Sequence, residues 1–481
     1  MASRFHVLRR TGLALLTAGS LFAAGAASGQ TAFGPLDSTS ETRVSFAGAE
    51  RGTPIQAGGD ANVSGQGFRP GQHVTLLHGS TPLPGATLTA DAEGKITGKL
   101  TIPADAVPGV HPIVVVAQAP YAATIAELKV SPTIPLSGQQ NYEITRAQPV
   151  RGLYQAAYSA KNNSLFVTAA IGRPPVRDSE IVKLNADTLA VLARVTPQAA
   201  PEPKRGPAPA GSPAPASVDP RPGVFAVYGV GVDDSKDTVW VTNTRQNAVA
   251  VYRQSDLSLV KQFEPGTVPH ARDIVIDQTL GKAYASPVGA PRIFVFDTAK
   301  LAIDKPVEIR SLRRGAEFSP ASLSLDAAAH KLYTVSMSTS EVAVIDTRTN
   351  AVEKVLAVPG TKSPIGVAHD PVTGRIFVAA QGSDNLVVLD KDGTVIADTP
   401  IGAGALNVLF DPVKRLAYVS NRGAGTVAVT DEDGKIVANL GPAPLANHAA
   451  SGKNGVVYVV DKSSGATDGG LDSVLRIRPK K

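Results

Sequence analysis

An aromatic residue recurs in the second position of seven short apolar segments, and this repeat restricts the possible fold more than any other feature of the chain. The segments are 165–168, 239–242, 283–286, 332–335, 376–379, 417–420 and 457–460. Their aromatic residues are separated by 74, 44, 49, 44, 41 and 40 positions. A period of about 40 to 50 residues, with several strand-like segments in each period, is typical of β-propeller blades. The repeat therefore predicts an all-β chain with a seven-bladed β-propeller over residues 142–481.

Two further features keep step with the aromatic repeat. An apolar third segment follows each aromatic one, at 181–184, 249–252, 293–296, 342–345, 386–389, 427–430 and 474–477. Seven positions before each aromatic stands an acidic or hydroxyl residue, namely Ser159, Asp233, Asp277, Asp326, Asp370, Asp411 or Ser451. Asp and Ser side chains accept hydrogen bonds from the backbone in tight turns. These seven residues are therefore predicted to stabilise turns between strands, not to catalyse a reaction.

The last repeat ends directly after its third strand-like segment, so its fourth strand is missing. An exposed sheet edge is a liability that proteins usually cover. The segment 142–146 precedes the first repeat and has no other evident role. We expect it to supply the missing outer strand and to close the ring.

Residues 42–132 carry a different pattern of short alternating strands separated by turn signals. The turns are marked by Arg69-Pro70-Gly71, Asp91-Ala92-Glu93-Gly94 and Val107-Pro108-Gly109. Such spacing is typical of a β-sandwich. The stretch 65–71, followed by 91–94, resembles the immunoglobulin-like modules of secreted bacterial proteins. An immunoglobulin-like β-sandwich is therefore expected ahead of the propeller.

Residues 1–29 have the pattern of a cleaved signal peptide. Arg4, Arg9 and Arg10 precede an apolar stretch that is too short to span a bilayer, and small residues follow at 24–29. Gly12 stands where a twin-arginine signal would carry a more hydrophobic residue, which favours the general secretory route. The predicted location is the periplasm or the exterior. The chain contains no cysteine, so disulfides and thiolate metal sites are excluded. We expect a monomer without a membrane span.

One repeat interval is longer than the rest because of an insertion. Residues 197–222 contain nine prolines and are rich in Ala and Gly. Such a segment buries little surface and is expected to be disordered or polyproline-like. Its position between two predicted blades places it on the face where propellers usually bind ligands.

The repeat units also resemble a known family. The segments 326–333 and 342–352, together with 239–243 and 418–421, are similar to the YVTN-type repeat of bacterial propellers, including its periplasmic YncE-like members. The resemblance covers residues 142–481 and implies a seven-bladed propeller. It also implies two partner classes, single-stranded DNA and TonB-linked uptake systems.

Propellers bind ligands at the mouth of the central channel, and the repeat register locates that mouth. The residues twelve and eleven positions before each aromatic should begin the inner strands there. They include Tyr154, Gln155, Tyr228, Arg272, Asp273, Asn407 and Asn447. His270 precedes two of them, and Arg245 and Arg422 lie in loops on the same predicted face. These side chains suit an anionic or aromatic ligand, such as a small molecule, single-stranded DNA or an envelope protein. The alternative interpretation is a polar rim around a water-filled channel.

The sequence favours a binding or adaptor protein over an enzyme. The histidines are scattered, no common metal-ligand spacing appears, and no cofactor motif is present. The prediction is therefore no metal, no cofactor and no catalytic residue. The alternative is a lactonase-like hydrolase in which His270, Arg272, Asp273 and His448 meet in one pocket.

Overall fold

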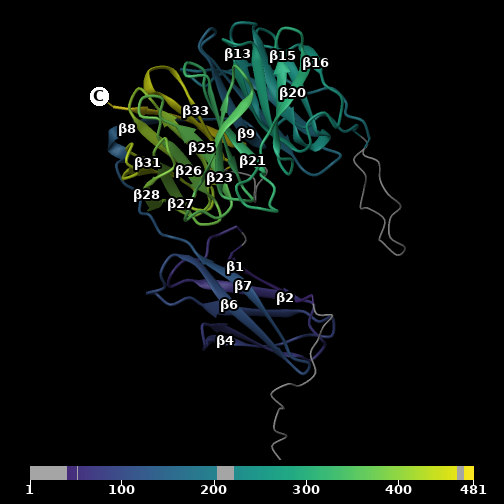
Figure 1. Ribbon diagram of the computed structural model, residues 1–481, viewed down its shortest axis with the longest axis vertical. Coiled ribbons are helices and arrows are strands. Elements are labelled where there is room, and N and C mark those ends of the chain that lie inside the picture. Colours follow the sequence, from purple (N-terminus) through teal and green to yellow (C-terminus); the bar gives the residue numbers. More distant parts are fainter. Residues whose placement is uncertain (1–40, 51, 203–220, 463–470, 481) are drawn as a thin grey trace, which may run out of the picture.

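The computed structural model describes residues 41–50, 52–202, 221–462 and 471–480. The predicted signal peptide lies outside these residues, as does the middle of the proline-rich insertion, 203–220. The described residues form nine β-sheets, two before residue 131 and seven after residue 141. Figure 1 shows them as a smaller purple-to-blue domain and a larger ring of sheets coloured from blue to yellow.

The N-terminal domain consists of two sheets that share one hydrophobic core. The first sheet has the order β1–β2–β5 and the second has the order β4–β3–β6–β7. Their bounds are β1 (Arg43–Gly48), β2 (Asp60–Gln66), β3 (His73–His78), β4 (Thr81–Thr89), β5 (Ile96–Thr101), β6 (Gly109–Gln118) and β7 (Ala122–Val130). Val63 of the first sheet and Val74, Leu76 and Val115 of the second belong to the same buried cluster. The domain is thus a two-layer β-structure.

The remaining seven sheets each contain four antiparallel strands. The first sheet comprises β9 (Leu153–Ser159), β10 (Ser164–Ile171), β11 (Asp178–Asn185) and β12 (Val191–Val195). The second comprises β13 (Val230–Asp233), β14 (Thr238–Asn243), β15 (Ala248–Arg253) and β16 (Leu259–Gln262). The third comprises β17 (Ala271–Asp277), β18 (Lys282–Pro287), β19 (Arg292–Asp297) and β20 (Ala302–Glu308).

The fourth sheet comprises β21 (Pro320–Asp326), β22 (Lys331–Ser336), β23 (Glu341–Asp346) and β24 (Ala351–Ala357). The fifth comprises β25 (Pro364–His369), β26 (Ile376–Ala380), β27 (Asn385–Leu389) and β28 (Val395–Pro400). The sixth comprises β29 (Ala405–Asp411), β30 (Leu416–Asn421), β31 (Thr426–Thr430) and β32 (Ile436–Leu440). The seventh comprises β33 (His448–Ser451), β34 (Val457–Val460), β35 (Asp472–Pro479) and β8 (Tyr142–Val150). Three short 3₁₀ helices are η1 (Gln139–Asn141), η2 (Thr244–Gln246) and η3 (Lys453–Gly455).

The recurring aromatic residues hold neighbouring sheets together. Phe166 of the first sheet packs with Val230 and Val241 of the second, and Trp240 of the second packs with Ile274 of the third. The same relation continues around the ring until Tyr458 of the seventh sheet, which packs against β10 and β11 of the first. The first strands of consecutive sheets contact each other in the same cyclic order. The sheets therefore surround a common axis, as the blades of a β-propeller do.

Burial within each sheet follows from this arrangement. The second strands β10, β14 and β26 are almost entirely buried, because both of their faces lie against neighbouring sheets. The outer strands β16 and β28 are largely exposed. The second strands contain continuous runs of Val, Ala and aromatic residues because both of their faces are buried.

The predicted closure by the segment before the first repeat is confirmed. β8 pairs antiparallel with β35, with Thr145 opposite Arg476 and Ile144 opposite Ile477. The paired strand extends to Val150 and is therefore longer than the expected 142–146. In Figure 1 the blue β8 lies beside the yellow C-terminal strands, so segments from opposite ends of the ring complete one sheet.

Six of the seven repeated Asp and Ser residues form turn hydrogen bonds, as predicted; Ser451 is the exception. The Oδ1 atom of Asp277 accepts hydrogen bonds from the backbone N–H groups of Thr279 and Leu280, at 3.1 and 3.0 Å. Equivalent bonds are formed by Ser159, Asp233, Asp326, Asp370 and Asp411. The side chains that form these bonds therefore contribute to the fold.

The two ends of the proline-rich insertion are joined by backbone pairing. Ala199 forms an isolated antiparallel bridge with Val224, and the N–H of Ala200 donates to the carbonyl oxygen of Gly223 at 2.8 Å. Backbone pairing is thus present at residues 199 and 200, within the segment that was expected to be disordered from residue 197.

Candidate functional site at the channel mouth

Two cavities lie along the axis of the ring. The mouth cavity has a volume of about 150 Å³ and is lined by Tyr154, Gln155, Arg272, Gln381, Leu406, Asn407, Arg422, Asn447 and His448. The lower cavity has a volume of about 770 Å³ and is lined by the inner strands below it. Both cavities include Asn407 and His448, so these two residues mark the constriction between them.

The structure brings together many of the residues that the repeat register had placed at the mouth. Six of the ten candidates line the mouth cavity, namely Tyr154, Gln155, Arg272, Asn407, Arg422 and Asn447. Tyr228 is buried and contacts the ring of Tyr154, whereas Asp273 lines the lower cavity. His270 is exposed and does not line the mouth cavity.

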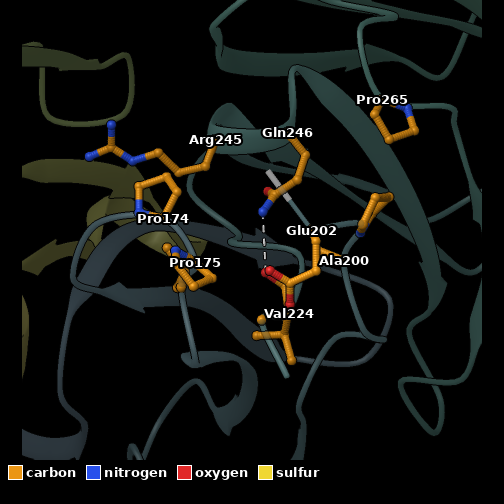
Figure 2. A pocket seen from close by; sticks show the side chains of 11 residues that line it. Pro174, Pro175, Ala200, Glu202, Val224, Arg245, Gln246 and Pro265 are labelled. Atoms are coloured by element: carbon orange, nitrogen blue, oxygen red, sulfur yellow. Dashed lines mark hydrogen bonds between the residues drawn. The ribbon is translucent and has the colours of Figure 1, made fainter. Parts of the chain in front are cut away.

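Arg245 borders a separate pocket at the base of the proline-rich insertion. This pocket has a volume of about 190 Å³ and is lined by residues that include Pro174, Pro175 and Pro265. Figure 2 shows the proline rings around it and the hydrogen bond from Gln246 to the carbonyl oxygen of Val224, which is 3.2 Å long.

Several polar side chains of the inner strands connect adjacent sheets. The side-chain oxygen of Gln155 accepts from the N–H of Val230 at 3.1 Å. Asp273 likewise accepts from Leu323 at 3.0 Å, and Asn407 accepts from Ala449 at 2.9 Å. In each case the donor belongs to the next sheet of the ring. These oxygens are therefore engaged in holding the inner strands together, a role that sequence spacing alone did not indicate.

Asp273 and His448 of the hydrolase alternative are buried and bond to neighbouring strands in the same way, whereas His270 is exposed. Burial raises the pKa of Asp273, whose oxygens accept hydrogen bonds from Leu323 and Ile274. Burial, with a further contribution from nearby Arg272, lowers the pKa of His448 to about 3. The Nδ1 atom of His448 lies 3.5 Å from the backbone nitrogen of Ala156. His448 is therefore neutral at physiological pH.

Positive charge collects around the mouth cavity. Arg272 and Arg422 line it, and Lys462 lies nearby, with its ammonium nitrogen 4.9 Å from the ring centroid of Tyr154. Burial, reinforced by the charge of Arg422, lowers the pKa of Lys462 to about 8. Burial also lowers the pKa of Arg422. Within the described part of the chain, neither these three side chains nor Arg245 forms an ion pair with a carboxylate.

Two tyrosine rings contact cations at and near the mouth. The rings of Tyr154 and Tyr228 meet edge to face, with centroids 4.8 Å apart and planes at 87°. Arg245 lies 6.0 Å from the centroid of Tyr228 and donates from Nε to its hydroxyl at 3.3 Å. Asn447 donates to the carbonyl oxygen of Tyr154 at 2.6 Å and accepts from Arg422. The basic groups are therefore held in fixed positions around the cavity.

Lys462 and Gln381 are also part of this site, and of the two the sequence pattern indicated only Lys462, as one of the cations in the loops after the aromatic strands. Lys462 is the second residue after the seventh aromatic strand, so the register placed it on the correct face. Its contact with Tyr154 joins the first and last sheets of the ring and could be found only after ring closure was known.

A second polar cluster lies in the lower cavity. The hydroxyl oxygen of Ser324 is 2.8 Å from Nδ1 of His369, and Nε2 of His369 is 3.6 Å from a carboxylate oxygen of Asp326. The imidazole of His369 stacks on Tyr333 with ring centroids 5.0 Å apart. Burial lowers the pKa of His369. The neutral imidazole can therefore accept a proton from the serine hydroxyl.

The described residues contain neither a cluster of metal ligands nor a membrane-spanning helix. No group of three or more His, Cys, Asp or Glu side chains in this part of the chain is arranged to hold a metal ion. No helix within the same residues is long and apolar enough to cross a membrane.

Comparison with known proteins identifies the fold class. No family model and no curated protein matches the chain. Hydrazine synthase from Kuenenia stuttgartiensis is similar in structure, with 14% identity, a TM-score of 0.53, and coverage of 68% of this chain and 96% of that one. The β-propeller domain of Cps50 (Swd1) from Myceliophteria thermophila gives 10% identity and a TM-score of 0.51, with coverage of 71% and 100%.

Raptor from Chaetomium thermophilum is also similar, with 11% identity and a TM-score of 0.52, over 71% of this chain and 29% of that one. At these identities the likeness concerns the fold alone. Together with the cyclic order of the sheets, it defines this chain as a β-propeller protein with an additional N-terminal β-domain.

Proposed function

We propose that this chain is a binding protein that captures a small anionic group at the mouth of its propeller. The observation that carries the proposal is the mouth cavity itself, where Arg272 and Arg422 form part of the wall and Lys462 lies close by. No described carboxylate forms an ion pair with these side chains, and the charge of Asp472 acts on Lys462 only from a greater distance. Partly buried cations that form no ion pair favour an incoming anion, and guanidinium groups suit carboxylate, sulfate or phosphate.

The size of the site and the use of its aromatic rings favour a small anion over stacked nucleic-acid bases. The mouth cavity, with a volume of about 150 Å³, is small and is large enough for one anionic group. One face of Tyr154 is occupied by Lys462, and Tyr228 is contacted by Arg245. Base stacking requires a free aromatic face. Binding of single-stranded DNA, or contact with a TonB-linked uptake system, remains an expectation from the family resemblance.

We also propose a more specific assignment for the two domains and for the location of the protein. We infer that the seven four-stranded sheets are the blades of a YVTN-type propeller, and that the two N-terminal sheets form an immunoglobulin-like domain. The basic and apolar pattern of residues 1–29 supports export, which places the anion-binding site in the periplasm or outside the cell.

Calorimetric titration with sulfate tests the proposal, because sulfate does not change its charge between pH 6 and 9. The double variant Tyr228→Ala/Arg272→Ala should bind sulfate at least about tenfold more weakly, which corresponds to about 1.4 kcal/mol. Arg253→Gln is the matched control, since Arg253 is exposed at the end of β15 and outside the mouth. Equal affinity of the double variant and the control would refute the site.

A second candidate function is supported by the Ser324–His369–Asp326 cluster. A serine hydroxyl bonded to a neutral histidine beside a carboxylate is an arrangement used for ester hydrolysis. The serine oxygen would attack the ester carbonyl while its proton passes to His369 Nδ1 and then to the leaving alcohol. Water would release the acyl group from Ser324 by the same proton transfers in reverse.

A panel of aryl esters and lactones tests this candidate. Hydrolysis that disappears in Ser324→Ala, but persists in Ser322→Ala, would support it. Failure of the wild-type protein to hydrolyse any member of the panel would dismiss it.

A further inference from the structure

A larger cleft adjoins the mouth cavity and is built jointly by the N-terminal domain and the ring. This interdomain cleft has a volume of about 560 Å³. Gln381 and Arg422 line both the interdomain cleft and the mouth cavity. The two spaces are therefore neighbours that share part of their walls, and Arg422 is the cation at their junction.

The walls of the interdomain cleft are mainly apolar. The N-terminal domain contributes residues of β1 and the following loop, including Phe46, Ala47 and Pro54. The ring contributes Ala403 and Leu445 from the loops between its sheets. A volume of 560 Å³ falls within the range of about 300 to 1,000 Å³ that is typical of ligand pockets.

Among the described charged residues that line the cleft, Arg422 is the one that forms no ion pair. Lys129 pairs with Asp384, and Glu127 pairs with Lys362. Arg422 has no carboxylate partner in the described chain and bonds only to the neutral side chain of Asn447. An apolar cleft that ends at an unpaired guanidinium is complementary to a molecule with an apolar chain and an anionic end.

Contacts between the two units fix the shape of the cleft. Asp384 accepts hydrogen bonds from Lys129 at 2.7 Å, from the hydroxyl of Ser131 at 2.6 Å and from the N–H of Gly404 at 2.7 Å. The connecting segment is also bound to the ring, because Ser137 forms an antiparallel bridge with Asn439 of β32. Both backbone hydrogen bonds of this bridge are 3.0 Å long. The cleft is therefore formed before any ligand arrives.

We propose that the ligand is an elongated amphipathic anion. Its anionic group lies in the mouth cavity at Arg272 and Arg422, and its apolar chain lies in the interdomain cleft. This inference rests on the proposed function and extends it, because it assigns the N-terminal domain a direct part in ligand selection.

Octyl sulfate and methyl sulfate, compared below the micelle concentration of the former, test the inference by calorimetry. Both probes carry the same anionic group, and only octyl sulfate has a chain that reaches the cleft. Octyl sulfate should bind at least about 100-fold more tightly, because burial of each methylene group favours binding. Arg422→Gln should weaken both probes.

Substitutions that place a bulky side chain in the cleft test this inference separately from the proposed function. Thr53→Trp and Ala47→Trp, both at exposed positions of the N-terminal wall, should remove the advantage of octyl sulfate and leave methyl sulfate binding unchanged. Thr97→Trp, at an exposed position of β5 outside the cleft, is the control and should retain the advantage. Melting curves of all variants without probe establish that they are folded.

Each result has a defined meaning. Methyl sulfate binding without any gain for octyl sulfate would overturn the inference and leave the proposed function intact, whereas failure of both probes would overturn both. An unchanged gain in Thr53→Trp and Ala47→Trp would place the chain elsewhere and reject the cleft. Self-association that Ala47→Trp abolishes would assign the cleft to a second copy of the protein and would also reject it.

Discussion

The ammonium nitrogen of Lys129 lies 2.7 Å from a carboxylate oxygen of Asp384 and thereby joins the last strand of the N-terminal domain to the ring. Asp384 belongs to the loop between β26 and β27, and its side chain is only 1% exposed. The pair is separated by 255 positions in the sequence. This ion pair holds the N-terminal domain against the ring beside the channel mouth.

Loss of the Asp384 carboxylate should loosen this junction. Asp384→Asn weakens the bonds from Lys129, Ser131 and Gly404, and hydrogen bonds to charged groups contribute about 1.5 to 3 kcal/mol each. Because Lys129 is partly exposed and can turn to water, we expect a loss of about 2 kcal/mol in unfolding free energy. Amide hydrogen exchange at Gly404 and Ser137 should become faster.

The ion pair between Lys362 and Glu127 provides the control at the same junction. Both side chains are substantially exposed, at 40% and 57%. Lys362→Gln should therefore change the unfolding free energy by less than about 0.5 kcal/mol. An equal effect of both substitutions would show that Asp384 has no special role.

Sulfate affinity should fall as the pH rises from 7 to 9.5. Lys462, whose pKa is lowered to about 8 by burial and by Arg422, loses its charge in this range. Arginine side chains keep theirs. The loss of one charged donor predicts a decrease of roughly tenfold. In Lys462→Met the affinity should be lower at pH 7 and independent of pH, and a retained pH dependence would assign the titration to another group.

The same pKa predicts a change in stability without ligand. The lysine pKa is lower in the folded state than its ordinary value of 10.5, so the unfolded chain binds more protons between about pH 8 and 10.5. The contribution of Lys462 to the unfolding free energy therefore increases as the pH rises through this window. Comparison of denaturant midpoints for the wild type and Lys462→Met at pH 7.5 and 10 measures it.

Closure of the ring by β8 can be tested by shortening the chain. A protein that begins at residue 139 keeps β8, whereas one that begins at residue 152 exposes the edge of β35. The shorter protein also loses Tyr142 and Ile144 from their apolar cluster. Burial of such side chains contributes about 1.5 to 3 kcal/mol each, so its melting temperature should be lower by about 10 °C.

A synthetic peptide covering residues 140–151 is the complementary test. Added to the shorter protein, it should restore most of the lost melting temperature by pairing with β35. Two proteins that melt at the same temperature would argue against this closure.

Much of the ring could be predicted because one register repeats along the chain. The aromatic residues mark the second strands, and counting back from them placed Tyr154, Arg272 and Asn447 in one cavity. Residue spacing could not show that the side chains of Gln155 and Asp273 accept hydrogen bonds from the next sheet, because those bonds depend on the distance between sheets.

The position of the N-terminal domain relative to the ring could not be predicted from the sequence pattern. No periodicity connects Lys129 or Ser131 with Asp384, and the cleft that they help to fix has walls from distant segments. The burial of Lys462 likewise depends on the closure of the first sheet against the last.

A crystal structure with selenate tests the central claim most directly, because selenate resembles sulfate and its selenium atom is located by anomalous scattering. We predict a single strong anomalous peak in the mouth cavity, within hydrogen-bonding distance of Arg272 and Arg422, and its loss in Arg272→Gln. Selenate bound only at exposed surface residues, with the mouth cavity occupied by water alone, would contradict the account.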